Sequence, residues 1–130
     1  MIIGGERLKL NFDPALPIYT QIVDGVKREI FSGSLVPGDR IPPVRELAME
    51  LGVNPNTLQR AMVELEREGL LFAERTSGRF VTTDGELIRK LRQDLVTELV
   101  REFLQEMRAL GCTSEEVETM IAQYRGKCDE

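Results

Sequence analysis

The chain has 130 residues, enough for one compact domain or a small domain with an appendage, and too few for a large catalytic scaffold. Its 42% hydrophobic and 30% charged residues are typical of a globular protein and argue against a disordered or fibrous chain. Histidine is absent, which excludes His-ligated metal sites and His-based acid–base catalysis. The net charge of −5, averaged over the whole chain, argues against a nucleic-acid-binding protein.

The sequence also bears on location and on redox chemistry. No apolar run approaches the length needed to cross a bilayer, and the first residues lack a positively charged leader pattern, so we expect a cytoplasmic protein. Two cysteines, Cys112 and Cys128, are too few for a disulfide framework or a four-ligand zinc site. We expect reduced thiols without a structural role, and the alternative is a redox switch at Cys112. No cofactor and no metal ion are expected.

The N-terminal third predicts an extended arm, a helix and a turn. Apolar and polar residues alternate over residues 8–12, which predicts a short strand or an extended arm. Between Pro17 and Gly33, apolar residues recur at every fourth position and predict a helix that begins at Pro17 and has one apolar face. Residues 35–39 have the composition of a turn, in which Gly38 follows a proline and is expected to have a positive φ.

Two short helices with a tight connection are predicted next. Two prolines and the apolar spacing after them predict a helix over residues 44–51. Asn54 is a favoured N-cap and Pro55 a favoured first helical residue, so a third helix begins there and is closed by Gly69. Because so few residues separate the two helices, their axes must cross sharply, as in a helix-turn-helix.

The rest of the chain predicts a hairpin and two further helices. Residues 70–75 and 79–83 are typical of two short strands around a glycine-containing turn. A helix of roughly 24 residues follows within residues 84–110, and its wide apolar face needs a partner. Thr113 and Glu116 have the spacing of a capping box, which predicts the start of a last helix.

These elements predict an α+β fold that is mostly α. The expected arrangement is a winged helix-turn-helix over residues 15–83, followed by a two-helix tail over residues 84–130 that dimerises.

The third helix begins with side chains that suit the edges of DNA bases. The polar residues that lie off its apolar stripe are Asn56, Thr57, Gln59 and Arg60. Asn and Gln bridge adenine, Arg bridges guanine, and Thr donates a hydrogen bond or contacts a methyl group. The alternative is a solvated polar face, on which Asn54 and Thr57 serve only the helix cap.

Three arginines extend this surface. Arg75 and Arg79 bracket the tip of the hairpin, where Gly78 leaves the backbone open to a phosphate or to the minor groove. Arg45 lies in the first turn of the second helix. Each arginine alone is readily explained by solvation, but together with the third helix they predict one DNA-binding surface.

Over residues 15–83 the sequence resembles the DNA-binding domain of GntR-type transcriptional regulators. The residues that carry the resemblance are Pro37-Gly38-Asp39-Arg40-Ile41-Pro42, Val44-Arg45-Glu46-Leu47-Ala48, Leu51-Gly52-Val53-Asn54-Pro55-Asn56-Thr57, Ala61-Met62, Leu65-Glu66-Arg67-Glu68-Gly69-Leu70-Leu71 and Gly78-Arg79-Phe80-Val81. The short tail, with residues 53–57, is similar to the YtrA subfamily, which implies a dimeric repressor of the kind that frequently controls transporter operons.

The resemblance also implies particular DNA contacts. They fall on Arg45, Asn56, Thr57, Gln59 and Gly78, with Asn54 and Arg60 adjacent. Pro43 stands where the family usually has a serine cap, and Pro55 stands where other branches often have an arginine. The strength of DNA binding is therefore expected to depend more on Arg45, Arg60 and the hairpin.

The leading hypothesis is a homodimeric, sequence-specific repressor of a transporter or adjacent operon that binds a palindromic operator. Its partners would be double-stranded DNA, a second copy of the chain and an unidentified small-molecule effector, with no membrane. The long helix is expected to dimerise through Leu91, Leu95, Leu99, Phe103 and Met107. The alternative for this helix is an intramolecular bundle.

A second hypothesis is an acidic winged-helix module that binds a protein and never DNA. The net charge motivates it, but that charge is unevenly distributed: residues 1–83 carry ten basic and eleven acidic groups, whereas residues 84–130 carry seven and eleven. An enzyme is not expected, because the chain lacks histidine and a glycine-rich phosphate loop.

Overall fold

The computed structural model describes residues 12–128, so most of the arm predicted over residues 8–12 lies outside the described residues. The chain divides into two compact units, Met1–Leu91 and Arg92–Glu130. The division falls inside the long helix α4 (Gly85–Ala109), and the domain boundary at residues 83 and 84 stays a prediction.

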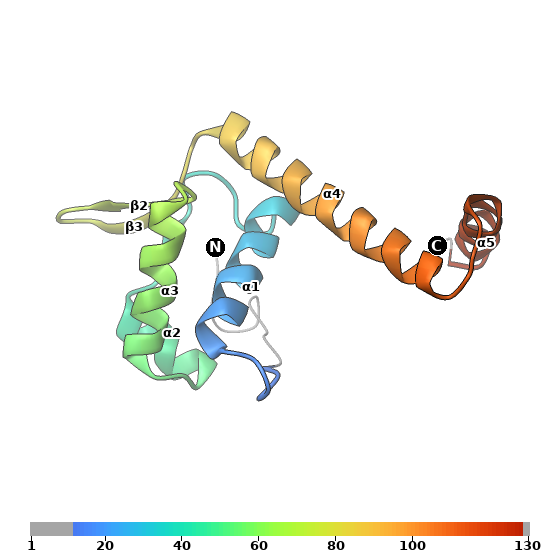
Figure 1. Ribbon diagram of the computed structural model, residues 1–130. Helices are drawn as coiled ribbons and strands as arrows, with labels where there is room; N and C mark the ends of the chain where they lie inside the picture. The colour runs from blue at the N-terminus through green and yellow to red at the C-terminus, as the bar shows by residue number, and fades with distance from the viewer. Residues whose placement is uncertain (1–11, 129–130) are drawn as a thin grey trace. The chain divides into compact units, whose positions relative to one another are not determined.

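Three helices form most of the first unit (Figure 1): α1 (Ile18–Ser32), α2 (Val44–Leu51) and α3 (Pro55–Arg67). Each lies where the sequence predicts it, and Gly38 has φ +89° in the predicted turn. One detail differs, because Pro17 is the N-cap of α1 and not its first helical residue. The packing of α3 against both α1 and α2 gives the predicted helix-turn-helix.

The sheet of the first unit has one strand more than the hairpin predicted from the sequence. Its strands are β1 (Arg40–Ile41), β2 (Leu71–Glu74) and β3 (Gly78–Val81), in the antiparallel order β1-β3-β2. Arg40 is opposite Phe80, and the neighbouring loop is held by the hydrogen bond from Val81 N to Asp39 O, 2.8 Å long. A strand of two residues has no alternating pattern, so only its pairing with β3 reveals it.

One hydrophobic core holds these elements together. Its fully buried side chains come from α1, α2, α3, the loop after α1 and the sheet: Ile22, Val26, Leu35, Leu47, Leu58, Met62, Leu65, Leu70, Leu71 and Val81. Burial of each large apolar side chain stabilises the fold by about 1.5–3 kcal/mol. The apolar stripe of α3 is therefore directed inward, which leaves the polar face of the same helix toward solvent.

The start of α4 belongs to this core as well. Ile88 and Leu91 are half-buried and pack against it. At the end of α3, Gly69 has φ +86°, and a Cβ there would lie 2.9 Å from Cδ2 of Leu87. The first turns of α4 therefore lie close to the end of α3, and only glycine fits at position 69 without a shift of its neighbours.

The second unit consists of the rest of α4 and of α5 (Ser114–Cys128). The predicted capping box is confirmed: Thr113 N donates to Oε1 of Glu116 at 2.8 Å, and Glu116 N donates to Oγ1 of Thr113 at 3.1 Å. Cys112 is a half-buried free thiol. Among the described side chains of this unit, only Val117 is buried. No helix within residues 12–128 combines the length and apolar character needed to cross a bilayer.

Candidate DNA-binding site

The first turn of α3 presents the polar side chains that the sequence selects. Asn54 is the N-cap, and its Oδ1 accepts a hydrogen bond of 2.7 Å from Asn56 N. The Asn54 amide is thus partly committed to the cap, whereas Asn56 and Gln59 are exposed and Thr57 is half-buried. Because a helix N-terminal turn fits the major groove, Asn56 and Gln59 are the residues of this turn best placed to reach base edges.

The side chain of Arg60, unlike those of Asn56 and Gln59, is directed toward α1. The centre of its guanidinium group lies 3.8 Å from the centroid of the Tyr19 ring on α1, in a cation–π contact. Arg60 is exposed, so the stacked guanidinium still presents an edge to solvent. Sequence reasoning did not select Tyr19, because no pattern in a single sequence relates an aromatic residue of the first helix to an arginine of the third.

Arg45 lies beside the first turn of α3 in space. It is exposed on α2, and it lines a hollow of about 370 Å³ together with Met49, Val53 and Pro55. The structure therefore brings the α2 arginine and Pro55, the first residue of α3, to the same hollow.

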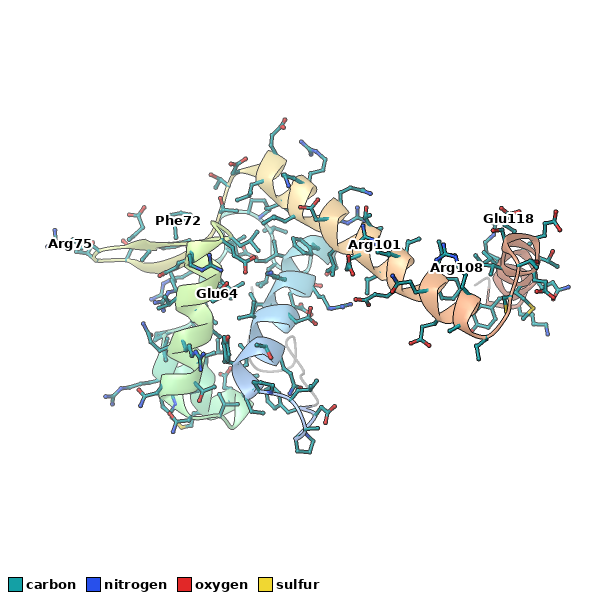
Figure 2. All side chains as sticks on the ribbon, in the orientation of Figure 1. Glu64, Phe72, Arg75, Arg101, Arg108 and Glu118 are labelled. Carbon is teal, nitrogen blue, oxygen red and sulfur yellow. The ribbon has the colours of Figure 1, made fainter. Side chains whose placement is uncertain are left out.

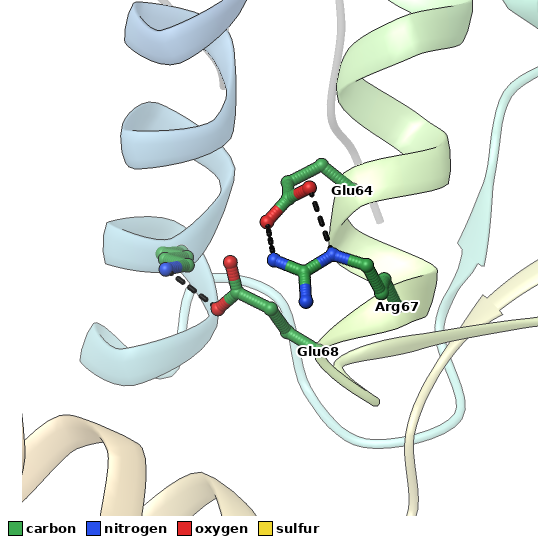
Figure 3. A network of polar contacts seen from close by, with 4 residues as sticks. Glu64, Arg67 and Glu68 are labelled. Carbon is green, nitrogen blue, oxygen red and sulfur yellow. Dashed lines mark hydrogen bonds and ion pairs between the residues drawn. The ribbon is translucent and has the colours of Figure 1, made fainter.

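The acidic residues of α3 are neutralised within the fold. Nε of Arg67 donates to Oε1 of Glu64 at 3.1 Å, and Nη2 binds the second carboxylate oxygen (Figure 3). Glu68, the C-cap of α3, forms an ion pair with Lys27 of α1, with 2.7 Å between Oε1 and Nζ. Glu66 pairs with Arg79 of the sheet, with 2.6 Å between Nε and Oε2. Each carboxylate toward the end of α3 thus has a cation of its own, which reduces the repulsion of DNA.

The Glu64–Arg67 pair carries a pH dependence. The hydrogen bonds from Arg67 lower the pKa of Glu64 below its ordinary value of 4.5. The unfolded chain therefore binds the proton more readily. The pair stabilises the fold at pH values above 4.5 and loses this contribution as the pH falls through the lowered pKa.

The hairpin of β2 and β3 forms the wing. Phe72 and Phe80 stack across it with ring centroids 5.7 Å apart, which stiffens the two strands. Figure 2 shows Arg75 at the outer end of the hairpin, where its side chain is exposed. Arg79, in contrast, is only 20% exposed and pairs with Glu66, so the structure places Arg75 and not Arg79 at the free tip.

The other candidate residues lie in the second unit or in the core. Leu99 and Phe103 are exposed on α4, and Leu95 and Met107 are half-buried. Leu91 differs from these four because it packs against the core of the first unit. Among the described residues, no group of three or more Cys, Asp or Glu side chains is arranged to hold a metal ion.

Comparisons with known proteins identify the family. The model of the family described as bacterial regulatory proteins, gntR family, matches residues 18–81. The uncharacterized HTH-type transcriptional regulator YhcF of Bacillus subtilis is 39% identical over 107 residues, which cover 82% of this chain and 88% of YhcF. The chain belongs to the gntR family. The HTH-type transcriptional repressor YtrA of Bacillus subtilis is 30% identical over 117 residues, covering 88% of this chain and 90% of YtrA.

Solved structures show the same likeness. A GntR family transcriptional regulator from Listeria monocytogenes has a TM-score of 0.82 and 38% identity, and the match covers 86% of this chain and 98% of that one. AraR(DBD), solved in complex with operator ORX1, has a TM-score of 0.54 and 29% identity over 60% of this chain and 100% of its own. As a member of the gntR family, the chain is a DNA-binding transcriptional regulator and not an enzyme. Every DNA-binding candidate lies within the matched residues 18–81.

Within this gntR-family domain, the two wing arginines are expected to respond differently to substitution. Arg79→Ala should lower the free energy of unfolding by about 1–2 kcal/mol, because Glu66 would lose its partner in a largely buried place. Arg75→Ala should leave stability unchanged within about 0.5 kcal/mol and weaken DNA binding, since its side chain is exposed at the tip. Urea denaturation and gel shifts on both variants measure the difference, and an Arg75 variant that unfolds more readily than the Arg79 variant would contradict the assignment.

Proposed function

We propose that the chain is a homodimeric repressor that binds a palindromic operator in the cytoplasm and controls a transporter operon or an adjacent operon. The observation that carries this proposal is the exposed, non-acidic start of α3, which bears Asn56 and Gln59 and whose first residue, Pro55, lines a hollow together with Arg45. These three side chains combine the groups that read adenine with a cation for guanine or phosphate. The repressor activity is proposed by analogy with YtrA, which carries that description.

The second unit supports the homodimer. Large apolar side chains are exposed on both of its helices and in the turn between them: Val96, Leu99, Val100, Phe103, Leu110, Met120, Ile121 and Tyr124. An exposed apolar surface of this extent is typical of an interface, and a second copy of the chain offers a matching one. Two copies related by a two-fold axis would present two α3 helices to two half-sites, which is why the operator is expected to be palindromic.

Selection from a random duplex library tests the proposal. The full-length protein should enrich a duplex with an inverted repeat, and gel shifts on this duplex should show specific binding at modest salt with a complex that contains two chains. If no sequence is enriched, or if the enriched duplex has a single half-site and binds one chain, the proposal is wrong.

The salt dependence of binding separates this function from the protein-binding alternative. Release of counterions from DNA makes the affinity fall steeply as salt rises, whereas a protein partner of an acidic module would show a much flatter dependence. Glu64, Glu66 and Glu68 are each paired with a cation of the same chain. This pairing favours the DNA-binding function over the protein-binding one, because it leaves little unpaired negative charge at the end of α3.

A further inference from the structure

The wing contains a second basic feature, which is lined by β1 and the hairpin tip and by no residue of α3. A hollow of about 350 Å³ is lined by β1, by the residues just after it and by the hairpin tip, and Arg40 and Arg75 are among its lining residues. Arg40 comes from β1, the strand that the sequence pattern does not reveal. The two arginines are distant in sequence, yet the sheet brings both to the same hollow.

The Arg40 side chain is held against the tip by one hydrogen bond. Its Nε donates to the carbonyl oxygen of Ser77 at 3.0 Å. Among the described residues, the Ser77 carbonyl is the only hydrogen-bond partner of the Arg40 side chain, which is exposed. Both Nη groups of the guanidinium therefore remain as donors for a ligand, in a side chain whose orientation is already restricted.

Gly78 makes room for this arrangement. It has φ +114°, and a Cβ at this position would lie 3.2 Å from both Nε and Nη2 of Arg40. A side chain at position 78 would therefore push the guanidinium away from Ser77, in addition to the backbone strain of a positive φ. The wing glycine thus has a role in placing Arg40, besides leaving the tip backbone accessible.

The charges around the hollow favour an anion. Arg40 and Arg75 are exposed, whereas Arg79 is neutralised by Glu66. Glu74 is the only acidic residue among those that line the hollow, so one positive charge remains in excess. The planar, fixed guanidinium of an arginine suits a phosphate, which it binds through two parallel hydrogen bonds.

We propose that Arg40, with Arg75 lining the same hollow, binds one phosphate of the operator backbone near the tip of the wing. The Ser77 carbonyl and the absent Cβ of Gly78 hold the Arg40 guanidinium in the orientation that receives this phosphodiester. The inference rests on the proposed function, because it requires that the wing meets the operator. It assigns to β1 a direct contact that strengthens binding without reading a base.

The test uses the full-length protein and the duplex that the wild type selects from a random library. Arg40→Ala should raise the Kd about tenfold and reduce the slope of log K against log salt by about one per bound chain, because one phosphate contact is lost. Arg40→Lys keeps the charge and should keep the slope. Arg28→Ala, which removes an exposed arginine paired with Asp24 on α1, is the matched control and should change neither quantity.

Ethylation interference tests directly whether Arg40 contacts a backbone phosphate. Ethylation of one phosphate beside the wing should block the wild type, and the same modification should no longer affect Arg40→Ala. An Arg40→Ala protein that loses affinity with an unchanged slope, or that remains sensitive to the same ethylation, would show that Arg40 only shapes the wing and would overturn the phosphate site. If the wild type selects no duplex at all, the proposed function fails instead, so the two failures are distinguishable.

Discussion

Gln59→Ala should weaken binding to the selected operator by about 1–3 kcal/mol, which is roughly 5- to 150-fold in Kd. Gln59 is exposed in the first turns of α3, and the apolar stripe of that helix is buried against the core, so Gln59 lies on the solvent-facing side that is proposed to meet the groove. A glutamine bridging an adenine supplies two hydrogen bonds, and their loss penalises the specific complex only. Gel shifts with the operator and with a scrambled duplex measure the change in specificity.

Gln93→Ala is the matched control for this substitution. Gln93 is an exposed glutamine of α4 whose amide donates to Oγ1 of Thr97 at 3.4 Å, so its removal costs little stability and no base contact. The control should bind the operator like the wild type. A Gln59 variant that loses equal affinity for operator and scrambled DNA, or that loses none, would contradict base recognition by this residue.

Phe103→Glu should convert the proposed dimer into a monomer and lower the apparent affinity for a palindromic duplex about 100-fold or more. Phe103 is 43% exposed and lies on the α4 row that also carries Leu99, so a carboxylate there would be buried without a partner in the dimer. The loss at the operator follows because two linked half-sites bind far more tightly than one. Sedimentation and gel shifts on the same preparation measure both effects.

Gln105→Glu introduces the same charge two residues away, at an exposed position off the apolar row. It should remain dimeric and bind normally. If Phe103→Glu stays dimeric, the α4 row is not the interface; if it becomes monomeric yet keeps full operator affinity, linked half-sites do not determine binding.

The helices were predictable because their signals are local. The proline and glycine residues around α1, α2 and α3, the Asn54 cap and the Thr113–Glu116 box all act within a few residues along the chain. The spacing of apolar residues then predicts the buried face of each helix, and the remaining positions of α3 form its polar face. The positions of Asn56, Gln59 and Arg45 at the surface therefore follow from the sequence.

The remaining features depend on contacts between residues that are distant along the chain. The sequence predicts Arg79 as an unpaired arginine of the wing. In the structure β3 lies close to the end of α3, and Arg79 forms an ion pair with Glu66. The contacts of Arg60 with Tyr19 and of Arg40 with Ser77 are of the same kind. Such pairs have no spacing that a single sequence displays, so the division of the arginines into free, stacked and paired groups required the structure.

The second unit, in which Val117 is the only buried side chain among those described, has a thermodynamic consequence for a regulator. In the proposed dimer, two helices that bury so little on their own gain most of their stability from association, so folding and assembly of this unit form one equilibrium. By mass action, its melting temperature then rises with protein concentration, whereas the winged-helix unit has a complete core and is independent of it. For the proposed dimer, the protein concentration in the cell therefore also sets the fraction of copies that are able to bind two half-sites.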